Sequence, residues 1–125
     1  MIILDTSIWI DFFNGNFEKN DILVDLIELR QVLFLECIAA ELLQGAKTKR
    51  EKDIIIEYWE NLPNISMDGL WIEAGIFSIK NKLIDKGIGI IDSVIIIACK
   101  KTNSKLLTKD KKILRIIEKE FVLDL

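Results

Sequence analysis

The chain has 125 residues, of which 50% are hydrophobic and 30% are charged, and its formal net charge is −3. A chain of this length buries roughly two-thirds of its unfolded surface, so we expect residues 1–125 to form one domain. The sequence contains no histidine, which excludes Ser-His-Asp and Cys-His catalysis and imidazole metal sites. The negative charge excludes a uniformly basic nucleic-acid-binding protein.

The two cysteines, Cys37 and Cys99, lie in apolar segments and lack CxxC spacing. We therefore expect buried, reduced thiols and a cytoplasmic protein. The apolar start lacks a basic leader and reaches Asp5 too early for a secretory signal peptide. No apolar run approaches the ~18 residues of a membrane span.

The first predicted elements meet at Asp5. The apolar run Ile2-Ile3-Leu4 before it is typical of a strand buried on both faces of a parallel sheet. Thr6 and Ser7 are favoured N-cap residues, and an apolar helical pattern follows them at once. Because ligands bind at the carboxyl ends of parallel strands, Asp5 is expected at the mouth of a crevice.

The rest of the chain alternates between helical and extended patterns. Helices are predicted at 21–30, 37–44, 53–62, 68–86, 93–101 and 111–119. Short strands are predicted at 32–35, around 65, at 106–108 and at 121–123. This alternation predicts a three-layer α/β/α sandwich around a short, mainly parallel sheet.

The bulky aromatic residues Trp9, Phe12, Phe13, Trp59 and Trp71 are expected to lie mostly in the core. The alternative is that some of them face a groove for a partner helix or a second subunit.

Four acidic residues recur at predicted strand-to-helix edges: Asp5, Glu41, Asp92 and Asp110. Each has a structural alternative, since Asp92 and Asp110 could cap helices and Glu41 could be a surface residue. Carboxylates gathered in one crevice repel one another, and a divalent cation such as Mg²⁺ or Mn²⁺ relieves that repulsion. Such a cation suits phosphodiester hydrolysis, because it lowers the pKa of a bound water and neutralises charge on the phosphate.

The sequence resembles PIN-domain proteins, most closely the small VapC-type toxins of bacterial or archaeal toxin–antitoxin pairs. The resemblance covers essentially the whole chain and rests on four ordered motifs. These are Ile3-Leu4-Asp5-Thr6-Ser7, Ala40-Glu41-Leu42-Leu43-Gln44-Gly45, Asp92 followed by Ile95-Ile96-Ile97-Ala98, and Leu106-Leu107-Thr108-Lys109-Asp110. It implies a PIN-like fold and a metal-dependent endoribonuclease, with Asp5, Glu41, Asp92 and Asp110 as catalytic metal ligands.

The same resemblance implies supporting roles for three hydroxyl residues. Thr6 or Ser7 is expected to hydrogen-bond the first carboxylate or a metal-bound water, and Thr108 to orient Asp110. Many family members carry a further acid two positions after the fourth, where this chain has Lys112. This departure argues against a second fully ligated metal and leaves the four-acid centre intact.

The partners implied by the resemblance are RNA such as transfer RNA, a second copy of the chain, and a small antitoxin whose tail covers the crevice. Residues 100–125 contain 8 Lys or Arg and 4 Asp or Glu, a local net charge of +4. This fits a phosphate-facing rim, with Lys109, Lys111, Lys112 and Arg115 as candidate RNA contacts, and it equally fits ordinary solvated helix faces.

Three rival functions share an acidic α/β pocket or the fold itself. A receiver-type signalling domain needs paired acids after the first strand, and only Asp5 is present there. A haloacid-dehalogenase-like phosphatase needs a second aspartate two residues later, where Ser7 stands. The non-enzymatic rival is a degenerate PIN domain that acts as a binding or scaffold module, against which the four acids argue.

Overall fold

The computed structural model describes residues 1–125 and contains a short parallel sheet between layers of helices. Its two strands are β1 (Ile2–Leu4) and β2 (Lys105–Leu107), which are hydrogen-bonded neighbours although they lie near opposite ends of the chain. Isolated parallel bridges extend this sheet by one residue on each side, at Val32 beside β1 and at Val122 beside β2. The predicted parallel sheet is therefore confirmed.

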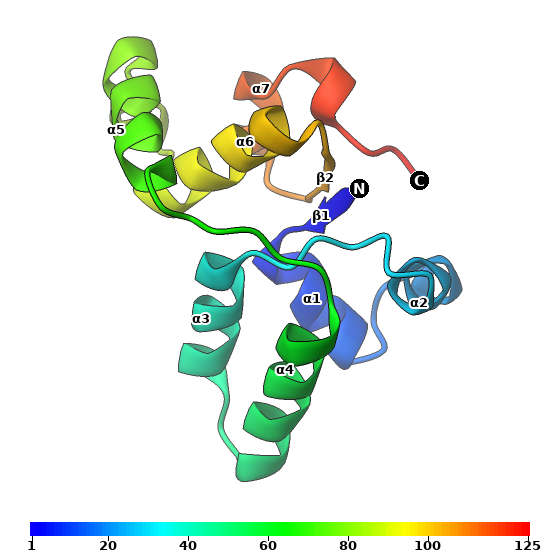
Figure 1. Cartoon of the computed structure of the whole chain (residues 1–125). Helices are drawn as coiled ribbons and strands as arrows, with labels where there is room; N and C mark the ends of the chain where they lie inside the picture. The colour runs from blue at the N-terminus through cyan, green and yellow to red at the C-terminus, as the bar shows by residue number, and fades with distance from the viewer.

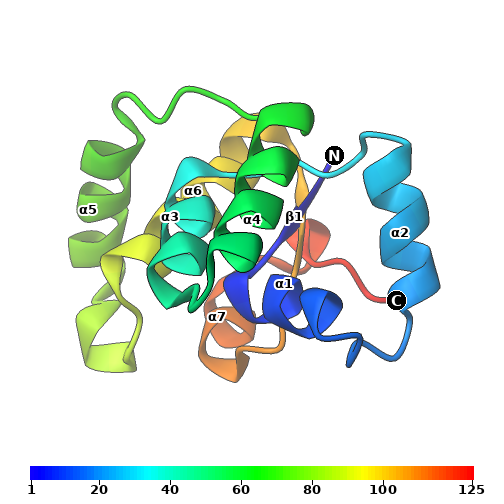
Figure 2. The same ribbon diagram turned by 90° about the horizontal axis from the view of Figure 1, so that it is seen from below.

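Seven helices surround this sheet. They are α1 (Thr6–Phe13), α2 (Asn20–Glu28), α3 (Glu36–Gly45), α4 (Lys49–Asn61), α5 (Leu70–Asn81), α6 (Ile90–Thr102) and α7 (Lys111–Ile116), with two 3-10 turns, η1 (Ile84–Lys86) and η2 (Lys119–Phe121). Figures 1 and 2 show α1, α3 and α4 on one side of the strands and α6 and α7 on the other, with α5 alongside α6 and α2 at one edge. This is the predicted three-layer α/β arrangement. No helix is both long and apolar enough to cross a membrane.

One continuous hydrophobic core joins the layers. Ile3 and Leu4 of β1 are fully buried, as expected for a strand covered on both faces. Every residue of α6 from Ser93 to Cys99 is buried, which explains why its sequence is apolar all round. Burial raises the pKa of the Cys37 and Cys99 thiols to about 12, so both are unreactive packing groups.

The aromatic residues are mostly core, as predicted. Trp9 is fully buried and stacks on Phe34 at 4.6 Å between ring centroids. Around this pair lie Phe12, Phe13, Tyr58 and Trp59. Trp71 is the exception, because it lies on α5 with 41% of its surface exposed.

The predicted sheet is too extensive. The segment 32–35 contributes one bridge at Val32, the segment 121–123 contributes one at Val122, and no strand forms around Ile65. Near Ile65 one hydrogen bond runs from the Phe34 N–H to the Pro63 carbonyl, at 2.8 Å. No bridge follows this bond, so the segment does not join the sheet.

The predicted helix at 68–86 is also wrong, because two residues with positive φ limit it. Gly69, at φ 81°, precedes α5, so Asp68 is not its cap. Lys82, at φ 53°, ends α5, and the chain then turns to bury Leu83 completely before η1. Burial of Leu83 stabilises the end of α5 at Lys82, although the apolar spacing of the sequence remains helical beyond that residue.

Other helix boundaries also differ from the prediction: α2 ends at Glu28 rather than 30, and α6 begins at Ile90 rather than 93. The helix α4 starts at Lys49 rather than 53, because Thr48 and Glu51 form a capping box. The helix α7 ends at Ile116 rather than 119, before the turn η2.

Candidate active site

Asp5 lies where β1 passes into α1, and both of its carboxylate oxygens accept hydrogen bonds. Oδ1 accepts from the Thr6 N–H at 2.8 Å, so Asp5 itself is the N-cap of α1 rather than Thr6 or Ser7. Oδ2 accepts from the Thr108 hydroxyl at 2.6 Å. The Asp5 side chain is thus fixed between the ends of the two strands, with 8% of the residue exposed.

Glu41 reaches the same region from α3. Its Oε1 accepts a hydrogen bond from the Thr6 hydroxyl at 2.7 Å, across 35 positions of sequence. Because Thr6 does not cap α1, its hydroxyl is free to make this contact. Glu41 is half-buried, so the alternative that it is a fully exposed surface residue is wrong.

Asp110 joins the group through the other threonine. Its backbone N–H donates to the Thr108 hydroxyl oxygen at 3.0 Å, and that hydroxyl donates in turn to Asp5. Asp110 also caps α7, since its Oδ1 accepts from the N–H groups of Lys112 at 2.8 Å and Ile113 at 3.4 Å. The capping alternative is therefore true of Asp110, and its second carboxylate oxygen makes no hydrogen bond.

Asp92 lies in the first turn of α6, whose N-cap is Gly89, so Asp92 is not a capping residue. Burial, followed by the charges of Asp5, Asp110 and Glu41 in that order, raises the pKa of Asp92 from 3.8 to about 6. A backbone hydrogen bond from Gly89 opposes this only in part. The electrostatic coupling shows that Asp92 shares one region with the other three acids, and no cationic side chain offsets their effect on its pKa.

These four acids come from distant segments and meet at the carboxyl ends of β1 and β2. Carboxylate oxygens are the hard ligands that Mg²⁺ and Mn²⁺ prefer, and the unrelieved repulsion at Asp92 is what a bound cation would remove. As they stand, however, no three potential ligands are arranged to hold one ion. The donor chemistry therefore fits a divalent cation, and binding requires the carboxylates to turn toward it. The hydrogen-bonded oxygens of Asp5 and Glu41 each accept one hydrogen bond and keep a further lone pair, and the second oxygen of Asp110 accepts none.

The remaining predicted site residues, which are Ser7 and the candidate RNA contacts, lie in different surroundings. Ser7 is exposed, and its hydroxyl forms no hydrogen bond within the protein. Lys109 forms an ion pair with Asp11 of α1, so its charge is already partnered. Lys112 and Arg115 line a pocket together with Lys86, a residue that the sequence analysis did not select. The available signal for Lys86 was its place just before the Gly87-Ile88-Gly89 turn that leads to Asp92.

The comparison with protein families decides the identity of the fold. The family model of the PIN domain matches residues 2–119. The chain belongs to the PIN domain family. Among solved structures, this PIN domain is similar to a chain in the crystal structure of VapBC2 from Rickettsia felis bound to a DNA fragment from their promoter.

The alignment with that structure covers 99% of this chain and 98% of the other, with a TM-score of 0.70 and 22% sequence identity. At this identity the likeness establishes the fold. No curated protein sequence matches the chain.

Proposed function

We propose that this PIN domain is a metal-dependent endoribonuclease, the toxin of a toxin–antitoxin pair, that hydrolyses RNA phosphodiester bonds at Asp5, Glu41, Asp92 and Asp110. The observation that carries the proposal is the threonine-linked group of acids, in which Thr6 holds Glu41 and Thr108 joins Asp5 to Asp110. Family membership and the fold shared with a VapBC2 chain support it. Structured or translation-related RNA, such as transfer RNA, is the substrate class that the resemblance suggests.

The protein's own residues would bind and orient the reacting groups. The four carboxylates would hold Mg²⁺ or Mn²⁺, while Thr6 and Thr108 keep the Glu41 and Asp5 oxygens oriented, as hydrogen-bonding partners of metal ligands commonly do. When bound, the cation supplies charge neutralisation at the phosphate and lowers the pKa of a water. Because Asp92 must be ionised to act as a ligand, cation binding near pH 6 should release protons.

We also propose a homodimer, a protein antitoxin and a cytoplasmic location. Ile72, Ile76 and Ile79 form a stripe along α5 and are 71%, 60% and 80% exposed, which supports an interface between two copies. The VapBC2 relative supports the antitoxin. The two free, buried cysteines accord with a reducing compartment.

The test is cleavage of a defined RNA with Mg²⁺ or Mn²⁺, with the new ends sequenced. Attack by a water should give 5′-phosphate and 3′-hydroxyl ends, and cleavage should stop with chelator or with Asp5→Asn. The matched control is Asp25→Asn, because Asp25 is an exposed acid on α2 that is not part of the four-acid centre. Products with 2′,3′-cyclic phosphates, or activity that survives both treatments, would reject the mechanism. A folded protein that binds Mn²⁺ and cleaves no RNA would favour the scaffold alternative.

A further inference from the structure

A pocket of about 410 Å³ lies between η1 and α7, beside the acidic centre, and its lining is mostly positively charged. It is lined by Lys86, Lys112, Arg115 and Ile116. None of the three cationic residues forms an ion pair with a carboxylate, whereas Lys109, in the connection just before α7, is paired with Asp11. Three like charges therefore converge on one hollow without a protein partner.

The position of Lys112 depends on Gly87. The Lys112 side chain lies along the Gly87 backbone, where a Cβ would stand 3.2 Å from its Nζ and 3.3 Å from its Cδ. Gly87 also has φ +77°, a conformation that favours glycine. The turn between η1 and α6 thus favours glycine because of its positive φ, and the missing side chain leaves room beside the backbone for the Lys112 ammonium group.

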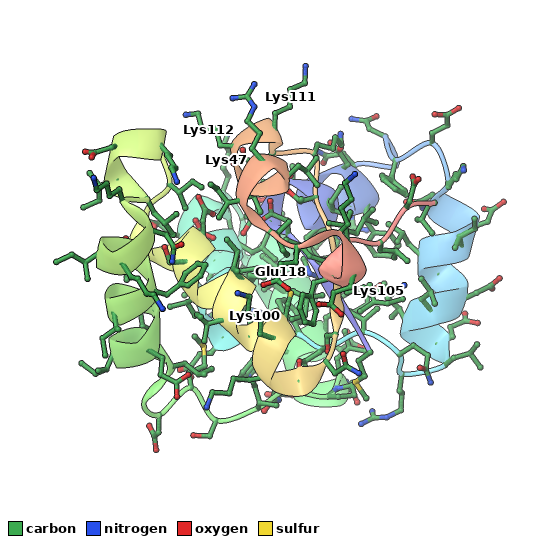
Figure 3. All side chains as sticks on the ribbon, turned by 90° about the horizontal axis from the view of Figure 1, so that it is seen from above. Lys47, Lys100, Lys105, Lys111, Lys112 and Glu118 are labelled. Carbon is green, nitrogen blue, oxygen red and sulfur yellow. The ribbon has the colours of Figure 1, made fainter.

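Each of the two segments that line the pocket is close in sequence to one of the four acids. Lys86 precedes Asp92 by six residues, and Lys112 follows Asp110 by two. Figure 3 shows Lys112 at the start of α7, where Lys111 leaves the helix in another direction. The Lys112 backbone N–H donates to the Asp110 carboxylate at 2.8 Å, so one wall of the pocket adjoins one of the four acids.

We propose that this pocket binds a backbone phosphate of the RNA strand next to the phosphate that is cleaved, an inference that rests on RNA being the substrate. Arg115 offers a planar set of donors that matches phosphate oxygens, and Lys86 and Lys112 add point charges. A nucleic-acid strand carries one charge per nucleotide at regular spacing, so one phosphate can occupy the pocket while its neighbour lies at the carboxylates. The proposed substrate of the neighbouring acids is RNA, which favours an RNA phosphate over an acidic peptide as the ligand.

The pocket should contribute to affinity without contributing to sequence preference, since phosphate contacts position a strand and do not distinguish its bases. For single strands, each neutralised phosphate adds about 0.7 to the steepness of the decline of log affinity with log salt. One phosphate in the pocket therefore predicts a loss of about 0.7 in that slope when the pocket charges are removed.

The experiment measures binding of a fluorescent single-stranded RNA at several salt concentrations, in an Asp5→Asn background that suppresses cleavage. The pocket variant is Lys86→Gln, Lys112→Gln and Arg115→Gln together. The matched control is Arg50→Gln, Lys52→Gln and Lys105→Gln, which removes the same charge at exposed residues of α4 and β2 outside the pocket. Lys105 lies well away from Lys112 in Figure 3.

We expect the pocket variant to bind RNA about tenfold more weakly, as for loss of a charged hydrogen bond, and with the shallower salt slope, while the control stays nearer the parent protein. Lys112→Arg alone, which keeps the charge, should retain binding. Equal losses in the pocket variant and the control would overturn the proposal, and so would unchanged binding by the pocket variant. Circular dichroism and thermal unfolding verify that each variant is folded.

Competition separates the sources of the phosphate. Inorganic phosphate or AMP that displaces RNA as effectively as an unlabelled oligonucleotide would overturn the proposal in favour of a free-anion site. Poly-glutamate binding that depends on the same three residues, with RNA binding unchanged, would overturn it in favour of a peptide site. Binding and cleavage also fail separately: RNA binding that depends on the pocket, in a protein that never cleaves RNA, would support the pocket and reject the nuclease.

Discussion

The two ends of α1 stand in opposite physical situations. At its start, Asp5 and Thr6 connect to a group of carboxylates in which burial, and then mutual repulsion, raises the pKa of Asp92. At its other end, Phe12 and Phe13 pack with Trp9 of the preceding turn, which is fully buried and whose Nε1 has no hydrogen-bond partner. The difference teaches that packing at one end of a helix can hold in place charged groups at the other end that would not assemble by themselves.

The largest expected effect is on stability and comes from the aromatic end. Trp9→Ala should lower the free energy of unfolding by about 3–5 kcal/mol, because it removes a buried ring and leaves a cavity. Urea denaturation followed by circular dichroism measures this loss. Trp9→Phe, which keeps a ring against Phe34, should lose clearly less. A Trp9→Ala protein within about 1 kcal/mol of the parent would show that packing at this end does not anchor α1.

The next effect concerns activity and separates the two ends. Asp5→Asn should reduce RNA cleavage about a hundredfold or more, because loss of a charged cation ligand removes several kcal/mol of transition-state stabilisation. Asparagine caps helices about as well as aspartate, so the unfolding free energy in chelator should stay equal or rise. Single-turnover cleavage and urea denaturation are measured on the same preparation. A variant that loses stability and activity together would contradict the separation of the two ends.

A smaller effect tests how the carboxylates are held. Thr108→Val keeps the shape of the side chain and removes the hydroxyl that donates to Asp5 and accepts from the Asp110 N–H. We expect Mn²⁺ affinity, measured by titration calorimetry, to fall by about 10–100-fold, as for other hydrogen-bonding partners of metal ligands. Thr108→Ser keeps the hydroxyl and should preserve affinity. If the Thr108→Val variant binds Mn²⁺ as tightly as the parent protein, the Thr108 hydroxyl does not help to hold the metal-binding carboxylates.

The contrast between the two ends also explains what the sequence could predict. Strand β1, the acid after it and the buried helix α6 follow from local apolar patterns, because burial on every side leaves an unbroken apolar run. Asp5 and Asp110 are recognisable for the same reason, since each follows a buried strand and precedes a helix, whereas Glu41 and Asp92 lie inside helices. Their relation to one another was only partly predictable, since the contact between Thr6 and Glu41 depends on how α1 packs against α3.

The failures have the same origin. The helix predicted at 68–86 was interrupted because burial of Leu83 outweighs continued helical periodicity. Lys86 was not among the predicted site residues, because it lines a pocket with residues of α7 and no local sequence pattern indicates that contact. Tertiary contacts decided these features, and a single sequence does not record them.

The smallest expected effect is a pH dependence at Asp92. In the folded protein its pKa is raised from 3.8 to about 6, so between these values the folded state retains a proton that the unfolded chain has lost. In chelator, the Asp92 contribution to stability is therefore complete below about pH 4 and is lost as the pH rises through about 6. Asp92→Asn removes this titration, so it should melt at a higher temperature than the parent at about pH 8, and the difference should vanish near pH 4. Excess Mg²⁺ at the higher pH should raise the melting temperature of the parent and leave the variant nearly unchanged, because binding to the folded state stabilises it. Differential scanning fluorimetry across pH measures both effects, and a melting difference that is independent of pH would show that folding does not raise the pKa of Asp92.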